Sequence, residues 1–154
     1  MRIWFKFVKS NLPGYENAFI IDTASQIGTR GSRRLVGEYT ITKEDLTSNK
    51  VHEDTVVMFA RMSRTEENAT NYFPYRALVP KKVDGLLTAG RSFSSDPYSN
   101  NFSNLIPHCI ATGQAAGTAA ALAVKNKIEP RAVNYKTLQK KLIAQGIPLP
   151  TGKK

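Results

Sequence analysis

The chain of 154 residues has the length of about one domain, and its 41% hydrophobic content can supply a core, which excludes wholesale disorder. The single cysteine, Cys109, excludes a disulfide within the chain. The net charge of +10 is compatible with an acidic binding partner. No window holds the roughly 18 apolar residues that a membrane helix needs, and no signal peptide begins the chain, so we expect a cytoplasmic protein without a membrane segment.

The first part of the chain predicts short elements separated by turns. In order, residues 1–11 fit the end of a helix, 18–22 and 34–42 fit short strands, 42–46 fit a helix and 55–62 fit a further strand. Pro13-Gly14 is the breaker that follows the first of these elements. The helix at 42–46 is predicted from Thr42 as N-cap, with Asp45 three residues on, close to a capping box.

The second part predicts two more strands and two longer helices. In order, residues 63–71 fit an exposed loop, 72–80 a strand, 85–90 a buried strand, 91–104 a polar loop, 103–126 a long helix and 134–145 a final helix. Pro74 and Pro80 confine the strand at 72–80 to a sheet edge or to a short pairing stretch, because proline cannot donate to a ladder. The final helix would take Asn134 as N-cap and Gly146 as the residue that ends it. Its buried side would hold Leu138, Leu142 and Ile143.

The long helix is built from small side chains. Between Ile106 and Ala123, seven of eighteen residues are alanine and two are glycine. One stripe of it holds Cys109, Gly113, Ala116, Gly117 and Ala120. Such a stripe lets a flat ligand or another backbone approach closely, and tight packing against a sheet explains it equally well. The order of strand, Gly90, polar loop and helix N-terminus is typical of a site for a negatively polarised ligand.

Arginines and histidines provide the remaining candidates. Arg30, Arg33 and Arg34 lie within five residues, and their guanidinium groups suit carboxylate or phosphate, although a surface basic patch is the alternative. His52 is interpreted as an exposed loop residue, whereas His108 falls in the first turn of the long helix. No histidine has the spacing of a metal ligand, so no metal site is predicted.

Basic residues are concentrated at the end of the chain. From residue 101 onward there are eight Lys or Arg residues and one acidic residue. No aromatic residues alternate with these lysines, and no nucleic-acid motif accompanies them, so a solvated helix face or a surface for an acidic partner is favoured over nucleic acid. A basic binding module for nucleic acid or an acidic partner is therefore the alternative function.

Three blocks, GTRGSRRLVGEYTITKEDL, FPYRALVPKKVDGLLTAGRSFSS and PHCIATGQAAGTAAALA, follow one another in the chain. In this order they resemble the C-terminal region of the FAD-dependent oxidoreductase family related to the fumarate reductase and thiamine-biosynthesis flavoproteins. The resemblance runs from about Leu12 to about Pro148. It implies an α/β fold class in the form of an α+β fragment. This would be the C-terminal part of a two-domain FAD-binding fold, with short strands, the Gly/Ala-rich helix and a C-terminal helix.

The same resemblance implies a division of the chain and a set of partners. Residues 1–80 would belong to the substrate-side or cap region, and residues 81–154 to the C-terminal segment of the FAD-binding domain. The G-x-G-x-x-G fingerprint that holds the ADP part of FAD is absent. The implied partners are therefore FAD, a small-molecule substrate and the N-terminal part of the same protein, with a homo-oligomer as a further option. Alone, the chain would be inactive, with its Gly/Ala face partly uncovered.

The resemblance also implies roles for individual residues. The cofactor-binding set would be Ala89, Gly90, Arg91, Asn104, Leu105, Ile106 and Gly113. The catalytic set would be Arg33, Arg34 and His108. Oriented amides at the turn before the long helix would stabilise the negative charge that flavin reduction builds. Gly31 departs from the acidic residue frequent in this family before the SRR block, which leaves the substrate unassigned.

Overall fold

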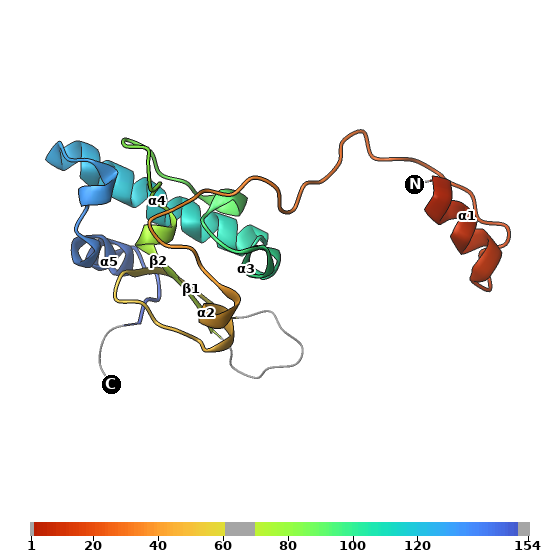
Figure 1. The fold of residues 1–154 in the computed structure, drawn as a ribbon, viewed down its shortest axis with the longest axis horizontal. Helices are drawn as coiled ribbons and strands as arrows, with labels where there is room; N and C mark the ends of the chain where they lie inside the picture. Colours follow the sequence, from red (N-terminus) through yellow and green to blue (C-terminus); the bar gives the residue numbers. More distant parts are fainter. Residues whose placement is uncertain (1, 61–69, 151–154) are drawn as a thin grey trace.

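The computed structural model describes residues 2–60 and 70–150, in which helices surround a small antiparallel sheet (Figure 1). The helices are α1 (Arg2–Asn11), α2 (Lys43–Thr47), α3 (Pro97–Phe102), α4 (Ile106–Asn126) and α5 (Tyr135–Ala144). The strands are β1 (Thr55–Ala60) and β2 (Thr70–Pro74), and the 3-10 turns are η1 (Tyr75–Ala77), η2 (Gly90–Ser92) and η3 (Pro130–Ala132). The predicted α+β class is confirmed.

Strands β1 and β2 pair antiparallel, with Val57 opposite Phe73. The predicted strand at 55–62 is confirmed as far as residue 60, and residues 61–69, which hold most of the predicted loop, lie outside the described residues. The predicted strand at 72–80 is right only at its start. Pro74 has no N–H to offer the ladder, and the chain turns into η1 immediately after it.

The predicted strand at 34–42 is wrong, although this segment is extended and hydrogen-bonded. It forms only isolated bridges, from Gly37 to Pro80 and from Ile41 to Ser95. A Cβ added at Gly37 would lie 2.8 Å from the Cβ of Ser94, so glycine is what permits this close approach. The neighbouring chain is too irregular, between η1 and Pro80, for a continuous ladder to form.

The predicted strands at 18–22 and 85–90 are also wrong. Residues 18–22 have no partner strand among the described residues, and Ile21 is 90% exposed. The run at 85–90 begins and ends with glycines in left-handed conformations, Gly85 at φ +67° and Gly90 at φ +71°. A strand needs a hydrogen-bonded neighbour along its length. Among the described residues, the one hydrogen bond that this run donates to another backbone segment goes from Thr88 to the carbonyl of Leu78, whereas Gly85 and Gly90 donate to side chains.

Helix α1 lies apart from the rest of the molecule, at the end of an extended segment (Figure 1). Its apolar residues Ile3, Trp4 and Phe7 share one face and are exposed, and none of its residues is buried. The helix ends ahead of Pro13-Gly14, as the sequence predicts, with Gly14 at φ +89°.

Helix α2 begins with the predicted capping box. The Asp45 N–H donates to Thr42 Oγ1, and the Thr42 N–H donates to Asp45 Oδ2. Helix α3 was predicted as part of a loop, and this was wrong. Asp96 accepts from the Ser99 N–H at 2.7 Å, and proline at the first turn is preorganised for a helix. The Asp-Pro pair was the signal for this short helix.

Helices α4 and α5 enclose the core against the hairpin (Figure 1). Helix α5 is capped by Asn134 and is followed by Gly146 at φ +85°, both as predicted. Leu138 and Leu142 are buried as expected, whereas Ile143 is exposed. The largest fully buried apolar side chains of the core are Ile41, Leu46, Val56, Val57, Phe73, Leu78, Phe93, Leu138 and Leu142.

The buried face of α4 differs from the predicted stripe. The buried residues are His108, Thr112, Ala115, Ala116, Ala119 and Ala123. Gly113 and Gly117 face open space, with no atom within 4 Å of an added Cβ. Ala116 of the stripe is buried in the core, so packing of the whole stripe on a sheet is wrong for this chain, and the Gly/Ala face is partly uncovered, as expected. Across the described ranges, no helix is both long and apolar enough to cross a membrane.

Candidate functional site

Three segments that are distant in sequence meet near the N-terminal end of α4. Arg91, in η2, joins them through its side chain and its backbone carbonyl. Its Nε donates to the carbonyl of Asn104 at 3.1 Å, and its Nη1 donates to the carbonyl of Thr29 at 3.2 Å. Its own carbonyl accepts from Asn100 Nδ2 at 3.0 Å. Arg91 thus ties the loop at 29–33 to α3 and to the residue that precedes the helix start.

Buried amide side chains set the geometry around Arg91. Asn104 is 2% exposed, and its Oδ1 accepts from Arg30 Nη2 at 3.1 Å. Asn100 is equally buried. A Cβ added at Gly31 would lie 2.6 Å from Asn100 Oδ1, so a side chain at this position would require the Asn100 amide to shift.

A pocket of about 380 Å³ opens where these segments meet. It is lined by Thr29, Arg30, Gly31, Ser32, Arg33, Arg91 and Ser92. Three of these residues are arginines and none is acidic. Within the described part of the chain, none of the three arginines forms a salt bridge. The pocket therefore carries a concentrated, uncompensated positive charge, and we call it the arginine pocket.

The first turn of α4 lies beside the arginine pocket. Leu105 is the N-cap residue and supplies no side-chain hydrogen bond, and Ile106 after it is exposed. The positive end of the helix dipole is thus left without a side-chain acceptor at the cap. Gly90 approaches the first two turns of α4, because its N–H donates to Thr112 Oγ1 at 2.9 Å and an added Cβ would lie 3.9 Å from Cys109 Sγ. Thr112 in turn donates to the carbonyl of His108 at 2.7 Å.

The structure brings together several of the residues predicted from the sequence. Arg33 and Arg91 line the arginine pocket, and Asn104 holds two of its arginines. Gly90 and the turn at 104–106 lie at the adjoining helix start. Ala89, which precedes η2, is half-buried against the core.

Other predicted residues lie elsewhere. Arg34 does not line the pocket, and its charge acts on Asp96. Burial acts to raise the pKa of Asp96, but N–H groups of Ser99 and Lys43 and the charge of Arg34 outweigh it, so the pKa is lowered. Gly113 lies further along α4, on its exposed face.

His108 points into the core. Its side chain sits in an aromatic cluster, with ring centroids 4.2 Å from Phe59 and 6.2 Å from Phe73. The residue is 3% exposed, and neither ring nitrogen has a hydrogen-bond partner among the described residues. Burial lowers its pKa, so the imidazole is held neutral. In this arrangement His108 is shielded from the arginine pocket.

Sequence reasoning assigned no role to Asn100 or Thr112, and it noted Arg30 only as part of a basic cluster. A Thr four residues after His108 in a helix gave a weak signal, because a helical Thr commonly bonds to the carbonyl one turn back. Asn100 gave no signal of its own. Its role comes from its contacts with Arg91 and Gly31, and the spacing of these residues in the sequence follows no helix or strand period.

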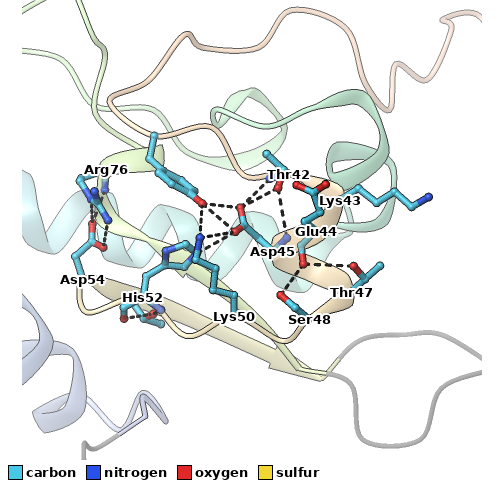
Figure 2. A network of polar contacts seen from close by, with 12 residues as sticks. Thr42, Lys43, Glu44, Asp45, Thr47, Ser48, Lys50, His52, Asp54 and Arg76 are labelled. Atoms are coloured by element: carbon cyan, nitrogen blue, oxygen red, sulfur yellow. Dashed lines mark hydrogen bonds and ion pairs between the residues drawn. The ribbon is translucent and has the colours of Figure 1, made fainter.

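A second polar cluster lies away from the pocket, where α2 meets the hairpin (Figure 2). Asp45 accepts from the Tyr39 hydroxyl at 2.8 Å and pairs with Lys50 at 3.1 Å. His52 Nε2 lies 3.9 Å from the same carboxylate. Arg76 forms a bidentate ion pair with Asp54, in which its Nε and Nη2 donate to the two carboxylate oxygens. The predicted exposure of His52 is wrong, because it is buried here, and this burial lowers its pKa despite the nearby carboxylate.

The charges of this second cluster are paired within it, so it serves to fix α2 to the start of β1. In the described parts of the chain, no group of three His, Cys, Asp or Glu side chains could hold a metal ion.

Comparison with known proteins identifies the family of the chain. A family model described as FAD dependent oxidoreductase matches residues 1–142. No curated protein and no solved structure shows significant similarity to the chain. The match covers most of the sequence, including all three segments that meet at Arg91. The chain belongs to the FAD dependent oxidoreductase family.

Proposed function

We propose that this chain supplies the flavin-facing loop and helix of an FAD-dependent oxidoreductase. The observation that carries the proposal is the convergence of η2, the turn at 104–106 and the loop at 29–33 on one side of the α4 N-terminus. When bound, FAD would supply the transfer of hydride or electrons. The residues of this chain would bind and orient it and would tune its charge.

The residues at the helix start fit such a cofactor. Gly90 adopts a left-handed backbone and carries no side chain, so the main chain can approach a flat ring closely. The N-terminus of α4 has no side-chain cap. Its amides and dipole would favour the negative charge that accumulates on a flavin during reduction. Ala89 and Arg91 flank Gly90, and Asn104, Leu105 and Ile106 form the opposing turn.

The proposal assigns the two parts of the chain different tasks. Residues 81–154 would form the flavin side of the site, and residues 1–80 the substrate side, with Arg33 in the pocket and Arg34 beside it. His108, held in the aromatic cluster, would position the first turn of α4. A small-molecule substrate would lie between the two sides.

A further part of the proposal concerns the ADP half of FAD. The 154 residues contain no G-x-G-x-x-G segment. We therefore assign the ADP half to a segment outside them, in the N-terminal part of the same protein, which would cover the exposed Gly113 and Gly117. On this basis the chain alone is inactive.

Two glycines with nearly the same backbone conformation provide the test. Gly90 (φ +71°) lies at the proposed flavin site, and Gly85 (φ +67°) lies outside it, near Glu129. Gly90→Ala and Gly85→Ala should each destabilise the fold by about 1 kcal/mol, because an L side chain disfavours this region. Only Gly90→Ala should lower the amount of flavin bound by the complete flavoprotein, measured from its visible absorbance. Equal flavin content in the two variants would contradict the proposal.

A further inference from the structure

We infer that the arginine pocket binds the oxyanion group of a ligand, a carboxylate or a phosphate, with Arg33 as the residue that contacts it. The inference rests on the proposed function and adds to it the chemical class of the ligand that binds beside Arg33. Only the identity of that ligand depends on the proposed function. The binding of an oxyanion follows from the pocket itself and can be measured on this chain without flavin.

The first argument is the way in which two of the guanidinium groups are held. Arg91 donates to the backbone carbonyls of Asn104 and Thr29, and Arg30 donates to the side-chain amide oxygen of Asn104. All three acceptors are neutral. They fix the guanidinium groups in position without compensating their charge, as a preorganised site for an anion requires.

The second argument concerns the position of Arg33. It lines the pocket, is exposed, and makes no salt bridge within the described ranges. Its forked guanidinium group matches the two oxygens of a carboxylate or a phosphate. Two arginines outside the pocket have carboxylate partners, Arg76 with Asp54 and Arg131 with Glu38. The contrast indicates that the charge of the pocket is reserved for a ligand.

The third argument is the loop that carries Arg33. Gly31 packs so closely on Asn100 that a side chain at this position would collide with it. The loop thus lies close to α3 at Gly31, and the residues on either side of this contact, Arg30 and Arg33, line the pocket. Ser32, between them, also lines the pocket and leaves room for a small polar group. The volume of about 380 Å³ is within the range of small-molecule sites.

Two sources could supply the oxyanion: the phosphates of a dinucleotide cofactor or the carboxylate of a substrate. The experiment is an NMR titration of the 154-residue chain, following the Arg Nε–H and backbone amide signals. The probes are inorganic pyrophosphate and malonate, each at constant ionic strength maintained with sodium chloride. Saturable shifts of the Arg33 and Arg91 signals are expected with at least one probe.

Variants locate the binding. Arg33→Gln should weaken it about tenfold or more, since it removes a charge-assisted hydrogen bond. Lys140→Gln removes the same charge from an exposed position on α5 and should change the affinity by less than about twofold, because distant charges are screened. Ser32→Glu should weaken binding by supplying an internal anion, whereas Ser32→Gln, of the same size, should not.

The outcomes separate the inference from the proposed function. Preference for pyrophosphate, with competition by FAD, assigns the pocket to the cofactor phosphates. Preference for malonate, unaffected by FAD, assigns it to a substrate carboxylate. Shifts that do not saturate, or that are the same in Arg33→Gln and Lys140→Gln, would overturn the inference. The flavin content of Gly90→Ala is a separate measurement, so either idea can fail while the other survives.

Discussion

At the scale of single residues, the unusual feature is a histidine kept neutral inside an aromatic cluster. Both ring nitrogens of His108 are buried without hydrogen bonds among the described residues. Leaving such groups unsatisfied costs free energy, and protonation inside the core costs more. His108 is thus better suited to packing between Phe59 and Phe73 than to carrying a proton.

This environment predicts a specific pH dependence. The pKa of His108 is lowered in the folded chain, so the unfolded state takes up the proton first as pH falls below about 6.5. The free energy of unfolding should therefore be independent of His108 above that pH and should decrease below it. His108→Phe should remove part of this decrease and raise stability at neutral pH by about 1 kcal/mol. Urea denaturation between pH 7.5 and 5 measures both effects.

His52 is the control for this prediction, because its pKa is also lowered by burial. The His108→Phe chain should keep a residual decrease in stability at acid pH that comes from His52. An unchanged pH dependence in His108→Phe would show that His108 does not titrate as the structure implies.

At the scale of elements, α4 serves two different environments. One face, with Thr112, Ala115 and Ala119, packs on the core, whereas the face with Gly113 and Gly117 is open. Glycine inside a helix is unfavourable on its own. Two glycines on an uncovered face therefore lower the stability of the helix, and no contact among the described residues of this chain offsets that loss.

The cost can be measured. Gly113→Ala and Gly117→Ala should each stabilise the isolated chain by up to about 1 kcal/mol, since helix propensity improves and no atom lies within 4 Å of the new Cβ. Thermal unfolding followed by circular dichroism is the measurement. Gly37→Ala is the opposite case and should destabilise, because its Cβ would collide with Ser94. Destabilisation by Gly113→Ala would mean that the face is covered within this chain.

At the scale of the whole molecule, the body of the chain is separable from its first helix. The core is formed from residues between Ile41 and Leu149, and α1 contributes nothing to it. The exposed face of Ile3, Trp4 and Phe7 therefore adds no stability to the rest of the molecule.

Deletion of residues 1–11 tests this separation. Since α1 contributes nothing to the core, the shortened chain should keep the melting temperature of the full chain within about 2 °C. For a chain of this size, even a change of about 1 kcal/mol in stability shifts the melting temperature by only a few degrees. Differential scanning calorimetry of the two chains makes the comparison. A fall of many degrees would show that α1 packs against the body in solution.

The sequence determined those features of the molecule that depend on neighbouring residues. The capping box at Thr42 and Asp45, the end of α5 at Gly146 and the extent of α4 follow from local hydrogen bonding and helix propensity. Ordered sequence blocks were also sufficient to indicate the family and to single out Arg33 and Arg91.

Only the tertiary structure decided which of these residues meet. The predicted strands at 18–22, 34–42 and 85–90 failed because a strand requires a regular neighbour that local sequence cannot supply. Packing of the whole small-residue stripe of α4 on a sheet failed for a related reason, since small side chains tolerate contact with any partner and specify none. The arginine pocket exists because Gly31 lets one loop rest on Asn100, while Asn104 receives hydrogen bonds from two arginines 61 residues apart. Such contacts depend on the path of the whole chain, and this path is set by the packing of the shared core.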